Sequence, residues 1–168
     1  MIACLDVQYS EDVATAAAVV FPVWESTEAT ATYTVSVLGI GAYEPGRFYE
    51  RELQPLLEVI DCIQQPIDIF VIDAYCYLSE ERSPGLGYHL WEALGRTKSV
   101  IGVAKTRYGK SAHAVELFRA GSKRPLYVTA LGMDYQSASE CIARMAGEFR
   151  HPALLKAVDR LSRGTNKS

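Results

Sequence analysis

Two short, almost wholly apolar runs constrain the fold of this chain most. Residues 67–73 read IDIFVID, and residues 98–104 read KSVIGVA. Runs of this length without polar alternation are typical of strands that are buried on both faces, as in the parallel part of an α/β sheet. The sequence therefore predicts a sheet with helices packed against it.

The N-terminal part of the chain has a different pattern. Residues 1–9, 13–24 and 29–43 are rich in β-branched and aromatic residues and are separated by short polar segments. This pattern predicts three antiparallel strands in a meander. A mixed sheet, with these strands followed by parallel ones, is the expected architecture.

The helices are indicated by apolar residues at helical spacing. The first follows the Pro-Gly at 45–46, and Pro55 predicts that it begins near Glu52 or kinks there. Further helices are expected at 87–94, 137–149 and 151–163, with a pair of short strands between residues 114 and 131. We expect one domain over residues 1–163 and a frayed tail at 164–168.

The charge is divided unevenly along the chain. Residues 1–104 hold 5 Lys/Arg against 15 Asp/Glu, a net charge of −10, whereas residues 105–168 hold 12 against 5, a net charge of +7. An acidic part suits metal ions and a basic part suits phosphates. Two solvated faces of opposite sign are the alternative.

The four cysteines are far apart and form no CxxC pair. This spacing argues against a disulfide framework or a zinc site, and it favours a reducing compartment. No apolar run is long enough to span a bilayer, and we see no signal peptide. We therefore expect a cytoplasmic monomer without membrane contact.

Three carboxylates form a candidate metal site. Asp6 and Asp73 each follow an apolar strand segment, and Glu52 lies near the start of the first helix. In α/β sheets, ligands bind at the carboxyl ends of the strands. Converging carboxylates repel unless a divalent cation neutralises them, and such oxygen ligands select Mg²⁺ or Mn²⁺. The alternative is that each acid caps a turn or forms a salt bridge.

A cationic loop begins where the second apolar run ends. Lys105 follows IGVA as Asp73 follows IFVI, so neighbouring strands would bring the ammonium beside the carboxylates. There it could hold a phosphate. Arg107 and Lys110 become candidate backbone-phosphate contacts, with a solvated loop as the alternative. His113 and His151 have no partner at ligand spacing, and we expect surface or helix-start positions for both.

Five segments together resemble the endonuclease V family. In order, they read DVQY, YEPGRFYERE, VIDAYCY, GLGYHL and IGVAKTR, and IGVAK at its distance after VID is the most specific. The resemblance implies a ribonuclease H-like fold. It also implies a metal-dependent endonuclease that hydrolyses a phosphodiester of DNA or RNA near inosine or deoxyinosine, in nucleic-acid repair or processing.

The resemblance also assigns site residues. It implies that Asp6, Glu52 and Asp73 bind Mg²⁺ (or Mn²⁺) and that Lys105 contacts phosphate, with a metal-activated water attacking phosphorus. Tyr43 and Pro45 match the family's wedge beside the lesion, and His89 matches a helix position that is either structural or catalytic. These assignments agree with the carboxylate cluster described above.

The sequence departs from the family pattern near the base. Glu44 stands between Tyr43 and Pro45, and Ala74 and Cys76 replace glycines that make room for the base. These differences bear on inosine recognition. They leave open a second interpretation, in which the chain is a non-catalytic nucleic-acid-binding module that kept the fold.

A further departure precedes the first of the two C-terminal helices. Met133 replaces a family histidine of the active site, and Asp134 follows it. Many ribonuclease H-like nucleases take a fourth acid from this place, so Asp134 is a candidate metal ligand. A helix N-cap is the alternative role for this aspartate.

Overall fold

The computed structural model describes residues 1–38, 48–109 and 113–164. In these ranges the chain forms seven strands and four helices, which confirms the predicted mixed α/β class. In chain order they are β1 (Ile2–Ser10), β2 (Val13–Phe21), β3 (Ala31–Leu38), α1 (Phe48–Asp61), β4 (Ile69–Ile72), α2 (Leu86–Ala93), β5 (Ser99–Ala104), β6 (Val115–Leu117), β7 (Leu126–Leu131), α3 (Tyr135–Arg144) and α4 (Ala153–Ser162).

The strands form one sheet in the order β3-β2-β1-β4-β5-β7-β6. β1, β2 and β3 are the predicted antiparallel meander, and β4 and β5 follow in parallel with β1. β7 runs antiparallel to β5, and β6 pairs with β7. The carboxyl ends of β1, β4 and β5 therefore point toward the same edge of the sheet, which we call the site edge.

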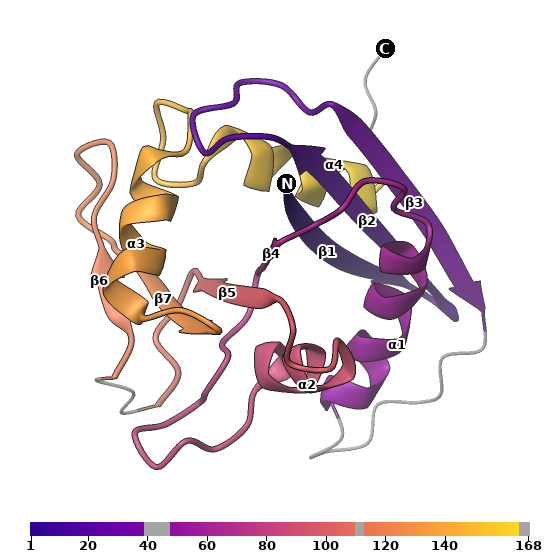
Figure 1. Cartoon of the computed structure of the whole chain (residues 1–168), viewed down its shortest axis with the longest axis horizontal. Coiled ribbons are helices and arrows are strands. Elements are labelled where there is room, and N and C mark those ends of the chain that lie inside the picture. Colours follow the sequence, from indigo (N-terminus) through magenta and orange to yellow (C-terminus); the bar gives the residue numbers. More distant parts are fainter. Residues whose placement is uncertain (39–47, 110–112, 165–168) are drawn as a thin grey trace.

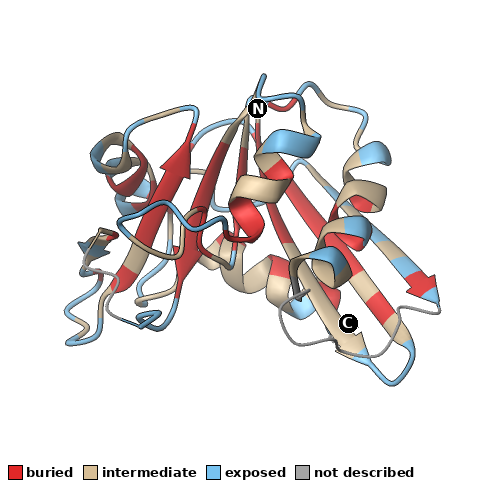
Figure 2. Cartoon of the chain, turned by 90° about the horizontal axis from the view of Figure 1, so that it is seen from below, coloured by how far each residue is buried: buried red, intermediate tan, exposed pale blue. Residues whose placement is uncertain are grey.

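Helices cover both faces of the sheet (Figure 1). The core that includes Leu56 of α1 and Leu90 of α2 lies on one face, and the core that includes Ile142 of α3 and Leu154 of α4 lies on the other. Side chains alternate along β1, so Leu5 packs on the first face and Cys4 on the second. In Figure 2 the central strands are buried, while exposed residues gather on the outer sides of the helices and at the strand ends.

Helix α1 differs from the sequence prediction at its start. It begins at Phe48, so the predicted start near Glu52 is wrong, and Pro55 lies inside the helix. Pro55 has no N–H to pair with the carbonyl of Arg51, four residues earlier. The hydroxyl of Tyr9 donates to that carbonyl oxygen instead, over 3.0 Å. A contact from β1 thus replaces the missing helical hydrogen bond.

Helix α3 spans Tyr135–Arg144 rather than the predicted 137–149. Asp134 caps its start, so the helix begins two residues earlier than the apolar spacing indicated. Its end is set by Met145, which has left the helical region, and by Gly147, whose φ of 122° favours glycine. Helix α4 lies within its predicted range. None of the four helices in the described ranges has both the length and the apolar character that a membrane span requires.

Candidate active site

The structure brings the three predicted carboxylates together at the site edge. Leu5 of β1 pairs with Ile72 of β4, so Asp6 and Asp73 are the next residues of two neighbouring parallel strands. Glu52 reaches the same place from α1, and all three side chains line one cavity of about 230 Å³. Asp73 directly follows β4, as the strand-end argument expects, whereas Asp6 lies within β1, which continues to Ser10.

Lys105 lies beside Asp73. Gly102 of β5 pairs with Ile72 of β4, so Asp73 is level with Val103, and Lys105 follows two residues later, directly after the end of β5. The Nζ atom of Lys105 is 2.6 Å from Oδ2 of Asp73, and both side chains remain partly exposed. Burial opposes the charged ammonium, but the Asp73 carboxylate outweighs it and raises the pKa of Lys105. The site thus holds a cation next to its acids.

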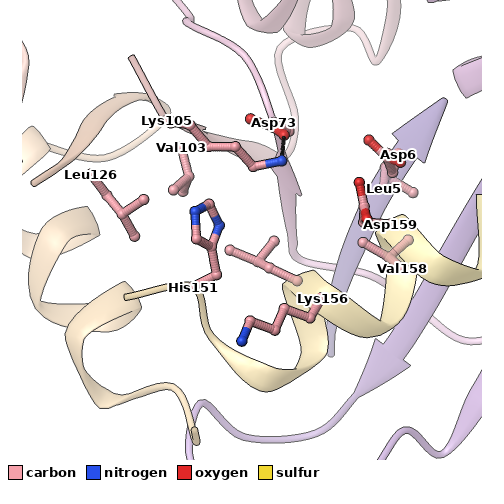
Figure 3. A pocket seen from close by; sticks show the side chains of 11 residues that line it. Leu5, Asp6, Asp73, Val103, Lys105, Leu126, His151, Lys156, Val158 and Asp159 are labelled. Carbon is pink, nitrogen blue, oxygen red and sulfur yellow. Dashed lines mark ion pairs between the residues drawn. The ribbon is translucent and has the colours of Figure 1, made fainter. Parts of the chain in front are cut away.

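Helix α4 contributes a fourth carboxylate and a hydroxyl that the sequence analysis did not identify. Asp159 faces Asp6 (Figure 3). The Ser162 hydroxyl donates to Oδ2 of Asp6 over 2.5 Å. Burial raises the pKa of Asp6, the Ser162 hydrogen bond opposes this, and the charge of Asp159 adds to the rise. One sequence signal was present, because Ser162 continues the apolar stripe of Leu154 and Val158 at four-residue intervals.

Glu52 has the most strongly perturbed carboxyl of the cluster. Burial, followed by the charges of Asp6 and Asp73, raises its pKa to about 7. The charge of Arg51 acts in the opposite direction. A carboxyl pKa rises in this way where the group is buried and other negative charges lie nearby.

The donor set fits a hard divalent cation. Across the described ranges, no three His, Cys, Asp or Glu side chains are close enough to enclose a metal ion directly. Mg²⁺ keeps several of its waters and binds through one or two carboxylates, so a looser set of oxygens is suitable. Asp6, Glu52 and Asp73 are the side chains that could hold such an ion, and their mutual repulsion is what it would relieve.

A second cavity opens on the α4 side of the same acids. It measures about 280 Å³, and Asp6, Asp73 and Asp159 line it together with Lys105, His151 and Lys156 (Figure 3). His151 is half-buried here. Burial lowers its pKa, and the charges of Lys105 and Arg150 lower it further. The imidazole is thus neutral near pH 7 and lies next to the acid cluster.

Asp134 does not join this cluster, which corrects its proposed role as a metal ligand. β7 is antiparallel to β5, and its last residue, Leu131, pairs with Val100 near the start of β5. Asp134 therefore lies toward the opposite edge of the sheet. It accepts hydrogen bonds from the Ser137 backbone N–H (2.8 Å) and hydroxyl (2.6 Å), and these lower its pKa. The alternative role, a helix N-cap, is the one observed.

The remaining predicted site residues have varied surroundings. His89 of α2 stacks on Tyr49 of α1, with 3.6 Å between ring centroids, and burial lowers its pKa. Arg107 forms an ion pair with Glu116 and lies over the Tyr127 ring. The predicted contacts Tyr43, Pro45 and Lys110, together with Glu44, lie outside the described residues.

The segment that follows Asp73 packs closely on the sheet. The backbone N–H of Cys76 donates to Oγ1 of Thr129 over 2.9 Å, and the Cys76 side chain is fully buried. A Cβ atom added at Gly102 would overlap the carbonyl oxygen of Ala74, and one added at Gly87 would overlap the Cys76 sulfur. Gly87 therefore makes room for the Cys76 side chain, whereas Gly102 makes room for the backbone of the 74–76 segment.

A mixed sheet of this order, with one acid within β1, one directly after β4 and one on the intervening helix, defines the ribonuclease H-like class. The family model described as Endonuclease V matches residues 1–145. The chain belongs to the endonuclease V family, which is a family of nucleases.

Solved structures agree with this assignment. Endonuclease V from Streptomyces avermitilis is 25% identical, with 97% of this chain and 79% of that chain covered and a TM-score of 0.80. The Ciona intestinalis enzyme, crystallised with a 24mer DNA containing an inosine followed by a ribo-adenosine, is 18% identical, with 97% and 84% covered and a TM-score of 0.79. Human ENDOV is 21% identical, with 97% and 82% covered and a TM-score of 0.76. No curated protein matches the sequence.

Proposed function

We propose that this protein is a divalent-metal-dependent endonuclease that hydrolyses a phosphodiester in DNA or RNA. The observation that carries the proposal is the convergence of Asp6, Glu52 and Asp73 from three elements, with Lys105 paired to Asp73. Membership of a nuclease family supports the reaction class. The family's use of divalent metals agrees with the oxygen-rich donor set.

In this proposal Asp6, Glu52 and Asp73 hold Mg²⁺ or Mn²⁺. When bound, the ion would supply a water of lowered pKa and offset charge on the phosphate. Ser162 orients Asp6 through its hydrogen bond. The ammonium of Lys105, 2.6 Å from Asp73, would turn to a non-bridging phosphate oxygen and stabilise the negative charge that develops there.

The proposed substrate is nucleic acid that contains inosine or deoxyinosine. The Ciona intestinalis relative was crystallised with inosine-containing DNA, and the two structures share 97% of this chain. We propose a role in nucleic-acid repair or processing in the cytoplasm, with residues 1–163 acting as one nuclease domain in a monomer. Tyr43, Pro45, Arg107 and Lys110 remain the proposed nucleic-acid contacts.

A second candidate is a non-catalytic nucleic-acid-binding module. Specific observations favour it: Met133 takes the place of the family histidine, and the Ala74–Cys76 segment is packed tightly against Gly102 and Gly87. In this alternative the Lys105–Asp73 ion pair neutralises the site permanently.

Calorimetric titration with Mn²⁺ separates the two candidates. The nuclease proposal expects binding by the wild type and at least a tenfold loss of affinity in Asp73→Asn. Asp134→Asn, which removes a carboxylate of the helix cap, is the matched control and should bind as the wild type does. A folded wild type without Mn²⁺ affinity would overturn the nuclease proposal.

The substrate is tested by cleavage in Mg²⁺. Single-stranded DNA, duplex DNA and RNA, each with and without one inosine, are incubated with the wild type and with Asp73→Asn. The proposal expects cutting of inosine-containing strands by the wild type alone. Equal cutting of inosine-free controls would refute the inosine preference while leaving the nuclease assignment in place.

A further inference from the structure

A strongly cationic cavity of about 490 Å³ adjoins the acid cluster. Its lining holds the cations Lys105, Arg107, Lys123, Arg124 and Arg150 together with His151, and its described part contains no Asp or Glu. Lys123 and Arg124 come from the turn between β6 and β7, whereas Arg150 and His151 come from the segment that joins α3 to α4. Three separate parts of the chain, the loop after β5 being the third, thus direct basic groups to one place.

The cationic cavity shares lining residues with the acid site. Lys105 and His151 line both this cavity and the 280 Å³ cavity that contains Asp6, Asp73 and Asp159. A phosphodiester chain with one phosphate at the acids would therefore meet the basic lining with its neighbouring phosphates. The two cavities have opposite charge, which suits a metal-bound phosphate in one and further phosphates in the other.

A buried arginine holds one wall of the cationic cavity in place. Arg119 is 8% exposed, and its guanidinium donates to the carbonyl oxygens of Met145 (2.5 Å), Phe149 (2.8 Å) and Arg150 (3.1 Å). These contacts hold the segment that presents Arg150 and His151. Arg150 in turn donates from Nη2 to the carbonyl oxygen of Lys105, while its Nε is buried without a hydrogen-bond partner among the described residues.

The β6–β7 turn provides the cationic cavity with two cations that are available to a ligand. Lys123 and Arg124 are exposed, and neither forms an ion pair within the described part of the chain. Arg107 differs, since Glu116 already pairs with it. Guanidinium and ammonium groups bind phosphate oxygens through charge-assisted hydrogen bonds, and arginine does so with two parallel bonds.

We propose that the cationic cavity binds backbone phosphates of the substrate strand next to the cleaved one, so that the strand leaves the acid site across the β6–β7 turn. The proposal rests on the proposed nuclease function and adds the path of the strand. The contacts are to phosphate, so they set the position of the strand without reading its sequence.

The test is strand binding by the double variant Lys123→Gln/Arg124→Gln. A fluorescein-labelled single-stranded 20mer with one deoxyinosine is titrated in EDTA, where no cutting occurs, at several salt concentrations. Loss of two phosphate contacts should lower the magnitude of the log–log salt slope by about 1.4, because each contact to a single strand contributes about 0.7. At low salt the affinity should fall about tenfold.

The matched control is Lys98→Gln/Arg144→Gln, which removes the same charge at the opposite edge of the sheet. Lys98 precedes β5, and Arg144 lies beside the N-terminal ends of β1 and β4. The control should retain wild-type affinity and slope. Equal losses in both double variants, or no loss in Lys123→Gln/Arg124→Gln, would overturn the proposed strand path.

Cleavage by the wild type in Mg²⁺ is measured separately, which keeps the two proposals distinguishable. Selective weakening of binding without any cleavage would support the strand path and count against the nuclease function. Cleavage with unaltered binding by Lys123→Gln/Arg124→Gln would support the nuclease function and refute the strand path. Thermal unfolding of each variant confirms that it is folded.

Discussion

The hydroxyl of Tyr9, near the end of β1, donates a hydrogen bond to the carbonyl oxygen of Arg51 in α1, 3.0 Å away. The Arg51 guanidinium also lies over the Tyr9 ring, 4.3 Å from its centroid. Asp6 lies three residues before Tyr9, and Glu52 directly follows Arg51. The pair therefore ties together the two elements that carry these carboxylates.

Removing the Tyr9 hydroxyl should destabilise the fold. Tyr9→Phe keeps the ring under Arg51 but leaves the carbonyl, already without a helical partner because of Pro55, unpaired. We expect a loss of about 1 kcal/mol in the free energy of unfolding, measured by urea denaturation. The control is Tyr49→Phe, whose exposed hydroxyl contacts Glu50 and should have little effect. Equal losses in both variants would contradict the role given to the Arg51 carbonyl.

The raised pKa of Glu52 makes stability depend on pH. The pKa of Glu52 is about 7 in the folded protein, against an ordinary glutamate value of 4.5, so the folded state binds more protons than the unfolded state between these two pH values. Stability without metal should therefore fall as pH rises from about 4.5 to about 7. In EDTA at pH 8, the free energy of unfolding of Glu52→Gln should exceed that of the wild type by about 2 kcal/mol. This is less than the whole pKa shift would give, because the side chain is partly exposed and solvent screens its charge.

This gain should disappear at pH 4.5, where the Glu52 carboxyl is protonated in the folded protein. Glu58→Gln is the control, since Glu58 lies on the same helix and contacts Gln54 rather than the acid cluster. Urea unfolding at a series of pH values provides the measurement. The raised pKa of Glu52 would be contradicted if the free energy of unfolding of the wild type rose between pH 4.5 and pH 7 and Glu52→Gln showed the same pH dependence.

Asp159 and Asp134 should behave differently when their charges are removed. Asp159→Asn takes away a carboxylate that faces Asp6, so we expect weaker Mn²⁺ binding, by about tenfold, in calorimetry. Asp134→Asn should leave Mn²⁺ binding unchanged and should alter stability by less than about 1 kcal/mol, because Asn also caps helices. The reverse result would restore Asp134 as the fourth acid.

Arg119 should be important for stability although it lies outside the acid cluster. Arg119→Met leaves three carbonyl oxygens of the 145–150 segment without their donor, and we expect a loss of about 3 kcal/mol in the free energy of unfolding. Arg119→Lys keeps a charge and part of the hydrogen bonding, so it should lose less. Arg124→Met, at an exposed position, should change stability by less than about 0.5 kcal/mol. Comparable stability of all three variants would refute the role of Arg119.

The part of the site carried by parallel strands could be predicted from the sequence. The apolar runs before Asp73 and Lys105 indicate buried parallel strands, and the carboxyl ends of such strands meet at one edge. Asp6 followed from the same reasoning. For these residues, the apolar pattern and the chain direction are enough to predict their position in the site, because parallel neighbouring strands place the residues at their carboxyl ends side by side.

The part carried by the C-terminal region could not be predicted in the same way. Asp134 comes shortly after a strand as Asp73 does, but β7 runs in the opposite direction, and the residues of a short strand do not encode their direction. Asp159 and Ser162 reach the site because α4 packs across β1 and β2, some 150 residues away in sequence. The local sequence indicates such long-range packing only weakly, through the position of Ser162 in line with the buried apolar residues of α4.

Gly102 shows how a residue without a side chain can control the spacing of charges. Its backbone lies against Ala74 and Cys76, and it stands in β5 three residues before Lys105, whose ammonium pairs with Asp73. A larger residue at this position would overlap the backbone of Ala74 and Cys76. It would push the 73–76 segment away from β5 and so separate the Asp73 carboxylate from the Lys105 ammonium. The absence of a Cβ atom at Gly102 thus helps to keep the Asp73 carboxylate close to the Lys105 ammonium, although Gly102 itself contacts neither charged group.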